Sequence, residues 1–145
     1  MRLVRGLATA GVLAALATAT AAEDFVVVVN PSVSGTNIHR RDLAALFLGK
    51  AIRWGSGAPA VPVDQSGTSA VRQAFSEMVL GMTVPTAIQY WQSQMLEGKP
   101  LRPPPGVKGS DTDVLAFVAK TKGAVGYVSA GTTIPPGVRA IAIID

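Results

Sequence analysis

The chain of 145 residues contains no cysteine and a single histidine. Without cysteine the chain can form no disulfide and carries no lipid-modified cysteine, and the usual structural zinc sites are disfavoured. Stability must therefore come from side-chain packing. The histidine, His39, has no marked nucleophile or acid around it in the sequence, so a Ser–His–acid relay is not predicted. We expect His39 to lie on the surface at the start of a helix.

Motifs that carry chemistry are equally scarce. The sequence lacks the glycine-rich phosphate loop, the dinucleotide fingerprint and the nucleophile elbow. No group of histidines and carboxylates has metal-ligand spacing, and Asp111 and Asp113 fit the start of a helix, where the dipole favours acidic side chains. These absences predict a protein that is not an enzyme and that uses no cofactor and no metal.

Charge of one sign is not concentrated anywhere. Thirteen Lys and Arg face nine Asp and Glu, which gives a net charge of +4. Arg2 and Arg5 fall within the first residues, and without them the net charge is +2. Arg40-Arg41 is a pair rather than a run, so nucleic acid is not a predicted partner.

The first 22 residues have the three parts of a secretory signal peptide. A short basic start, Met1 to Arg5, precedes an apolar run from Gly6 to Ala19, and the small residues Ala19-Thr20-Ala21 fit a cleavage site. A membrane anchor is the alternative, but the run is shorter than the ~20 residues that a spanning helix needs. We therefore expect residues 23–145 to form an exported, periplasmic domain that does not span the membrane once the leader is removed.

Residues 23–145 are enough for one domain with its own core. Apolar β-prone runs predict strands at 25–29, 60–63, 124–128 and 138–144. Helical spacing predicts helices near 40–48, 68–80, 84–96 and 110–122, and the proline-rich segment 98–109 is expected to be irregular. We expect an α/β fold with a mostly parallel, short sheet flanked by helices. The expected inward helix positions are Leu43, Leu46, Phe47, Val71, Phe75, Met78, Val79, Ile88, Trp91, Met95, Val114, Phe117 and Val118.

The segment between the second strand and the second helix is the candidate functional site. It reads Asp64-Gln65-Ser66-Gly67-Thr68-Ser69. Ligands of open α/β sheets bind at the carboxyl ends of strands, and backbone N–H groups at a helix start favour anions. Gly67 lets a ligand approach the backbone, while the hydroxyls of Ser66, Thr68 and Ser69 add donors. The pattern suits a small oxyanion.

Asp64 and Arg72 are charged residues close to this loop in the sequence, and the loop also has a purely structural interpretation. Arg72, one turn along the helix, could reach back to an anion with its planar guanidinium. Asp64 could accept a hydrogen bond from a protonated oxyanion or tie down the loop, and the tie is favoured. The alternative for the whole loop is structural: Ser66 would be an ordinary N-cap and Gly67 a turn residue. Judged by local pattern alone, that alternative is favoured.

Five sequence blocks occur in an order that resembles a known family. They are FVVVVNP (25–31), ALFLGK (45–50), Trp54, VPVDQSGT (61–68) and GAVGYV (123–128). The chain resembles the phosphate-binding proteins of bacterial phosphate ABC transporters, which have the type II periplasmic-binding-protein fold. The resemblance implies one lobe of that fold. It also implies phosphate binding at Ser66, Gly67 and Thr68 through hydroxyls and amides, and it matches Asp64 to a family aspartate.

Two departures from that family affect the functional expectation. Family members often carry an arginine two positions before the aspartate, where this chain has Pro62, and Arg72 is a candidate substitute. Family members also have two lobes that close over the ligand, whereas residues 23–145 leave room for one. A single lobe leaves one side of the anion in water, so binding should be weak.

The sequence therefore predicts an exported phosphate-binding-protein-like domain that binds phosphate or a related oxyanion weakly and is linked to phosphate transport or sensing. An envelope transporter or sensor protein is the expected partner class, and a second lobe could come from a partner or a second copy. The alternative is a protein-interaction module of the bacterial envelope that retains the scaffold without the ligand. The missing arginine at position 62 favours this alternative.

Overall fold

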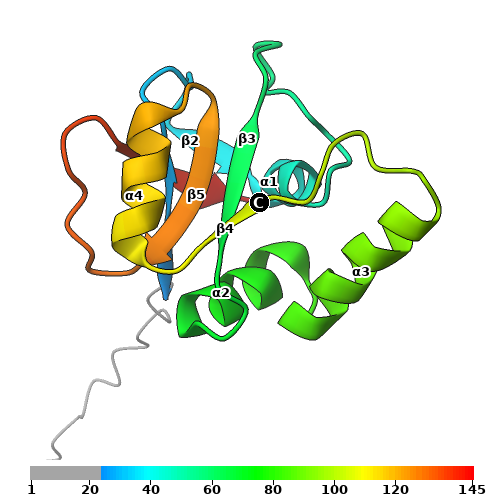
Figure 1. Cartoon of the computed structure of the whole chain (residues 1–145). Coiled ribbons are helices and arrows are strands. Elements are labelled where there is room, and N and C mark those ends of the chain that lie inside the picture. Colours follow the sequence, from blue (N-terminus) through cyan, green and yellow to red (C-terminus); the bar gives the residue numbers. More distant parts are fainter. Residues whose placement is uncertain (1–23) are drawn as a thin grey trace, which may run out of the picture.

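The computed structural model describes residues 24–145, so the predicted leader (1–22) lies outside the described residues. Strands and helices alternate along most of the chain (Figure 1). In chain order they are β1 (Phe25–Val29), β2 (Asn37–His39), α1 (Arg40–Phe47), β3 (Val61–Gln65), α2 (Ala70–Phe75), the π-helical turn η1 (Ser76–Leu80), α3 (Val84–Leu96), β4 (Gly106–Lys108), α4 (Asp111–Lys120), β5 (Ala124–Ser129) and β6 (Arg139–Ile144).

The strands form one six-stranded sheet in the order β2-β6-β1-β5-β3-β4. Strand β1 runs antiparallel to both of its neighbours, β5 and β6, whereas the β2–β6, β5–β3 and β3–β4 pairs are parallel. The expected mostly parallel, short sheet flanked by helices is confirmed. The antiparallel direction of β1 departs from the parallel majority of the sheet, and the sequence did not show it, because a strand that is apolar on both sides indicates cover on both faces and not strand direction.

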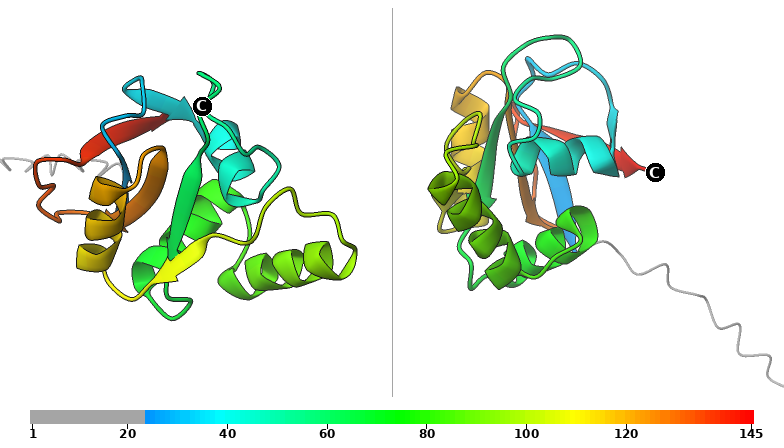
Figure 2. Two further views of the ribbon diagram at one scale, coloured as in Figure 1. Left: turned by 45° about the horizontal axis from the view of Figure 1, so that its top comes forward. Right: turned by 90° about the vertical axis from the view of Figure 1, so that its right-hand side faces the viewer.

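Helices cover both faces of the sheet (Figure 2). On one face, α1 and α2 pack against Phe25, Val27 and Tyr127 in a core cluster that also contains Phe47 and Phe75. On the other face, α4 packs its buried side chains over the opposite positions of the same strands. This second cluster contains Val28, Val63, Val114, Val118, Ala124, Val128 and Val138. In the helices that cover the sheet, most of the side chains that we expected to face inward are buried, among them Leu43, Val71 and Val114.

The strand boundaries differ from the prediction around the candidate site. Asp64 and Gln65 belong to β3 and not to the loop, because β4 pairs with β3 as far as Gln65 and Lys108. Strand β4 lies in the segment that we expected to be irregular, and β2 was also missed. Both are three-residue edge strands, too short to show a hydrophobic period.

The second predicted helix changes its winding half-way. Residues Ser76–Leu80 form a π-helical turn, and the Ser76 hydroxyl donates to the Met82 carbonyl at 2.7 Å. The wider turn shifts which side chains face inward. Ser76 and Arg72 are buried, whereas Met78, expected in the core, is 37% exposed.

The third predicted helix, α3, does not lie on the sheet (Figure 1). Its buried residues are Val84, Ala87 and Trp91. Ile88 and Met95, expected to share the buried face with Trp91, are exposed. The helix packs Trp91 against Gly49 at the end of α1, whereas Met95 and Leu96 near its own end are exposed.

Several of the family-like blocks have structural roles. Gly123 has a φ of +76°, and a Cβ there would lie 2.1 Å from the Pro59 carbonyl oxygen. Trp54 Nε1 donates to the Gly123 carbonyl at 2.9 Å, and its half-buried ring packs against the first core cluster. Asn30 Nδ2 donates to the Val118 carbonyl at 2.8 Å and ties the end of β1 to α4.

Candidate functional site

The loop of residues 66–69 connects the carboxyl end of β3 to α2. Ser69 is the N-cap of α2, and its hydroxyl accepts from the Arg72 backbone N–H at 3.1 Å. The structural alternative that made Ser66 the N-cap is therefore wrong, because the helix begins three residues later. The Ser66 hydroxyl instead shares a 3.1 Å hydrogen bond with the Thr68 hydroxyl. Both hydroxyls thus lie together on the loop.

The backbone N–H groups of the loop divide into two pairs. Those of Ser66 and Ser69 are used within the protein, donating to the carbonyls of Lys108 and Ser66 at 3.0 Å each. Gly67 and Thr68 are exposed, and across residues 24–145 no protein oxygen accepts from their N–H groups. The loop therefore offers two amides and two adjacent hydroxyls to an acceptor from solution.

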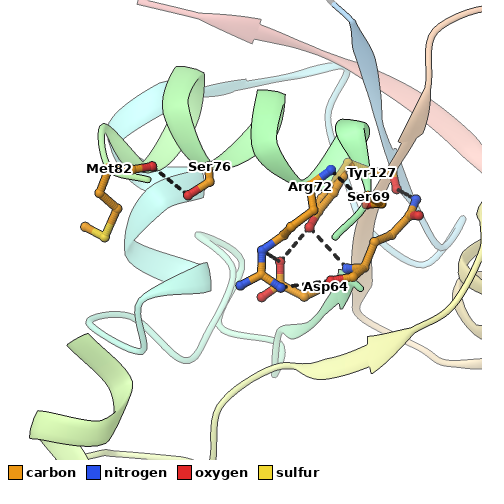
Figure 3. Close-up of polar contacts among 7 residues, drawn as sticks. Asp64, Ser69, Arg72, Ser76, Met82 and Tyr127 are labelled. Atoms are coloured by element: carbon orange, nitrogen blue, oxygen red, sulfur yellow. Dashed lines mark hydrogen bonds and ion pairs between the residues drawn. The ribbon is translucent and has the colours of Figure 1, made fainter. Parts of the chain in front are cut away.

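A buried polar network lies directly beneath the loop (Figure 3). Arg72 Nη1 donates to the Gln65 carbonyl at 2.9 Å, and Arg72 Nε lies 3.6 Å from Asp64 Oδ1. The Tyr127 hydroxyl donates to Asp64 Oδ1 at 2.7 Å and accepts from the Gln65 N–H at 3.1 Å. The network joins α2 and β5 to the last two residues of β3.

The charges of this network compensate one another. The Asp64 and Arg72 side chains are 8% and 7% exposed, and burial raises the pKa of Asp64 against the lowering effects of Arg72 and the Tyr127 hydrogen bond. Burial and the neighbouring Asp64 also raise the pKa of Tyr127. Because the ion pair is neutral as a whole, an anion at the loop would be held by amides and hydroxyls rather than by a free charge.

Arg72 supplies the ion-pair partner that residue 62 cannot. Pro62 lies on β3 with no charge to offer, and Arg72 reaches Asp64 from the following helix. From the sequence we expected both charges at the loop, and in the structure they pair with each other. The Asp64 side chain contacts Tyr127 on β5 and Arg72 on α2, and neither residue belongs to the loop of residues 66–69.

Tyr127 and Asp111 also position the strand end before the loop, and these roles were not predicted from the sequence. Tyr127 lies in the predicted strand at 124–128, but its place opposite β3 could not be inferred without the sheet order. Gln65 Nε2 donates to Asp111 Oδ1 at 2.7 Å, and Asp111 Oδ1 also accepts from the Ser129 N–H at 3.1 Å. Burial alone would raise the pKa of Asp111, but the hydrogen bonds it accepts from Gln65, Ser129 and Thr132 outweigh burial and lower it.

An apolar wall borders the loop on the side of α3. A Cβ on Gly67 would lie 3.5 Å from Val84 Cγ1 and 4.0 Å from Ile88 Cδ1. This is ordinary van der Waals contact, so α3 approaches the loop closely without crowding it. The candidate site thus has polar groups from the loop and a hydrophobic flank from the start of α3.

A separate cleft of about 490 Å³ lies among β2, α1 and the turn at 53–56. Its polar lining includes Ser34, His39, Asp42 and Arg53. None of residues 64–72 lines it, so the cleft and the loop are distinct features. None of the helices in residues 24–145 combines the length and hydropathy needed to cross a bilayer.

Comparison with solved structures identifies the fold. The chain is similar to an ABC-type phosphate transport receptor from Vibrio cholerae (TM-score 0.63, 21% identity, covering 83% of this chain and 46% of that one). It is also similar to PstS from Borrelia burgdorferi (TM-score 0.64, 17% identity, 83% and 47% covered). A phosphate ABC transporter substrate-binding protein with bound phosphate from Clostridium perfringens gives a TM-score of 0.65 at 18% identity, with 83% and 44% covered.

The chain spans less than half the length of these solved structures. At such low identity the likeness establishes the fold: the chain folds like part of a phosphate transport receptor. The sequence matches no family profile and no curated protein.

Proposed function

We propose that this chain is an exported domain that binds phosphate or a related oxyanion weakly at the loop of residues 66–69, and that it serves phosphate transport or sensing. The observation that carries the proposal is that the backbone N–H groups of the exposed residues Gly67 and Thr68 have no acceptor across residues 24–145. The hydroxyls of Ser66 and Thr68 lie beside them. The fold supports the proposal because one similar solved structure holds phosphate.

Each group at the site has a distinct role in this proposal. The amides and hydroxyls donate to the anion oxygens, and such charge-assisted hydrogen bonds are the strong ones. Ser69 caps α2, while Asp64 and Arg72 hold the strand end that carries the loop. Because their charges compensate, the loop offers no free cation to a dianion. The proposal therefore favours the singly charged, protonated form of an oxyanion and predicts modest affinity.

Isothermal titration calorimetry with phosphate and with sulfate tests the proposal. We expect weak heat of binding for at least one of the two anions. Thr68→Val keeps the side-chain volume and removes the hydroxyl, and Ser66→Ala removes its partner. Each should weaken binding by roughly tenfold to a hundredfold, since a hydrogen bond to a charged group contributes about 1.5–3 kcal/mol.

Thr133→Val is the matched control, because Thr133 is exposed and lies outside the loop. This variant should bind as the wild type does. The proposal fails if neither anion gives heat, or if Thr68→Val and Ser66→Ala leave the affinity of the wild type unchanged.

A second candidate function is a ligand-free interaction module of the bacterial envelope. The neutral Asp64–Arg72 pair and Pro62 favour it, because no cation is left to hold an anion. Affinity capture from envelope extracts, with and without added phosphate, separates the two functions. A stoichiometric partner recovered equally in both conditions, together with absent heat for the anions, supports the module.

A further inference from the structure

The cleft of about 490 Å³ beside β2 and α1 has both apolar and polar lining residues. Val33, Leu46 and Ile141 line it, and each of them is buried. The partly buried Ile38 and Trp54 also line it and pack against the first core cluster. Pockets that bind small molecules have volumes of roughly 300–1,000 Å³, mostly apolar walls and a few polar groups. The cleft therefore has the size and the composition of a small-molecule site.

Hydrogen bonds to the rest of the domain hold the walls of the cleft in place. At the turn, Trp54 Nε1 donates to the Gly123 carbonyl at 2.9 Å. The segment before β2 is held from β6, where the Arg139 guanidinium donates to the carbonyls of Val33 and Gly35. A ligand therefore has few groups of the protein to order when it binds, and such preorganisation favours affinity.

Two side chains of opposite charge line the cleft, Asp42 from α1 and Arg53 from the turn. Within residues 24–145 no ion pair joins them. Asp42 Oδ1 lies 3.8 Å from Arg41 Nε, but these side chains are 60% and 85% exposed, and such surface pairs contribute little. Arg53 Nη1 donates to the Gly57 carbonyl at 3.0 Å, whereas its Nε and Nη2 have no acceptor in the described part of the chain. Both charges are therefore available to a ligand.

We propose that this cleft binds a small zwitterion with an apolar side chain, either a free apolar amino acid or a short apolar peptide. Arg53 binds the carboxylate, because a guanidinium and a carboxylate can form two parallel hydrogen bonds. Asp42 accepts hydrogen bonds from the ammonium group. The apolar side chain lies against Val33, Leu46 and Ile141, where its burial adds a hydrophobic contribution.

The two charges select a zwitterion over other small molecules. An anion is attracted by Arg53 but repelled by Asp42, and for a cation the two effects are reversed. A zwitterion pairs with both charges and has no repulsive contact, which is the basis of its selection. None of residues 64–72 lines the cleft, so this inference goes beyond the proposed anion binding and does not depend on it.

Isothermal titration calorimetry of the full chain with L-phenylalanine, and separately with the dipeptide leucyl-phenylalanine, tests the proposal and distinguishes the two kinds of ligand. We expect heat of binding from at least one of them. The N-acetylated form of that probe lacks the ammonium group, and its C-terminal amide lacks the carboxylate. Each of these analogues should bind about three- to tenfold more weakly, since each loses one charged contact at an exposed side chain.

Arg53→Gln and Asp42→Asn each remove one charge from the cleft and should weaken binding of the zwitterion about three- to tenfold. Arg53→Gln should cause no further loss for the amide, and Asp42→Asn no further loss for the acetylated form, because the contact is already absent. Lys120→Gln and Asp113→Asn are the matched controls. They make the same changes of charge at exposed positions of α4 that do not line the cleft, and they should bind as the wild type does.

Circular dichroism of each variant checks that it folds. The proposal is overturned if neither probe gives heat, if the two analogues bind as tightly as the zwitterion, or if either Arg53→Gln or Asp42→Asn binds the zwitterion as the wild type does. Phosphate is titrated in a separate experiment, so failure of one proposal leaves the other measurable.

Discussion

The Tyr127 hydroxyl donates a 2.7 Å hydrogen bond to Asp64 Oδ1 across two strands of the sheet. The same hydroxyl accepts from the Gln65 N–H at 3.1 Å, and the ring stacks on Phe75 with centroids 3.9 Å apart. One phenol therefore fixes the end of β3 immediately before the loop of residues 66–69. The position of the candidate site depends on the core residue beneath it.

Tyr127→Phe should destabilise the protein by about 2–3 kcal/mol, because it leaves a buried carboxylate oxygen and a buried N–H without a partner. The phenylalanine ring preserves the packing, so the lost stability measures the contribution of the hydroxyl alone. Urea denaturation at neutral pH measures it. Tyr90→Phe is the comparison, since Tyr90 donates a single 2.7 Å hydrogen bond to the Leu48 carbonyl at a less buried site. It should cost about 1 kcal/mol, and an equal cost for both variants would contradict the role assigned to Tyr127.

Arg72→Met should cost about 3 kcal/mol at neutral pH, because it strands the buried Asp64 carboxylate without its cation. Methionine retains most of the aliphatic volume. Arg41→Met is the control, since the Arg41 side chain is 85% exposed, and its cost should be near zero. Denaturant midpoints of the two variants against the wild type give the difference.

The cost of Arg72→Met should also shrink in acid. Burial already raises the folded-state pKa of Asp64 above the unfolded value, and losing Arg72 raises it further. A group whose pKa is raised on folding binds its proton preferentially in the folded state, so stability rises as the pH falls through that raised pKa. The variant should therefore recover part of its lost stability as the pH falls from neutral toward the unfolded-state pKa of about 3.9. A deficit that stays constant over this range would show that Asp64 does not carry the effect.

The long elements could be predicted from the sequence because each shows its own period. The runs at 25–29 and 124–128 are strands, and the helix near 110–122 has its N-cap at Ser110. The direction of β1 could not be predicted, because an apolar run buried on both faces looks the same in either orientation.

The loop of residues 66–69 could be placed between a strand and a helix from the sequence, but the contacts around it could not be predicted. Arg72 was identified as a charge that could reach the loop, yet it is buried and contacts Asp64 and the Gln65 carbonyl of β3 instead. The exposed stripe of α3 was mistaken for core because Ile88, Trp91 and Met95 share helical spacing. Periodicity shows that a helix has apolar positions, and only the neighbouring elements decide which of them are covered.

Gly126→Ala should destabilise the protein by about 2 kcal/mol through overpacking. A Cβ there would lie 2.8 Å from both Val114 Cγ1 and Val63 Cγ1. Combining Gly126→Ala with Val114→Ala should cost less than the sum of the two single variants by about 1 kcal/mol, since the smaller side chain makes room. Gly106→Ala is the control because nothing lies within 4 Å of its Cβ position. Strict additivity in thermal or urea unfolding would contradict this packing explanation.

Asp111→Asn should remove a pH-dependent contribution to the free energy of unfolding. Hydrogen bonds from Gln65, Ser129 and Thr132 lower the folded-state pKa of Asp111 despite burial. A group with a lowered pKa stabilises the folded state above its unfolded pKa of about 3.9, and that contribution is lost as the pH falls through the folded-state value. At neutral pH the variant should be about 1 kcal/mol less stable than the wild type, a small value because solvent screens the partly exposed helix end. The difference should vanish in strong acid, where both chains carry a neutral side chain.

Asp113→Asn is the control in the same helical turn. Asp113 lacks the side-chain hydrogen bonds that Asp111 makes to β3 and β5, so this variant should change urea midpoints less at neutral pH. The hydrogen bonds of Asp111 hold Gln65 in place from the side of α4. Asp111→Asn should therefore also weaken any anion binding at residues 66–69.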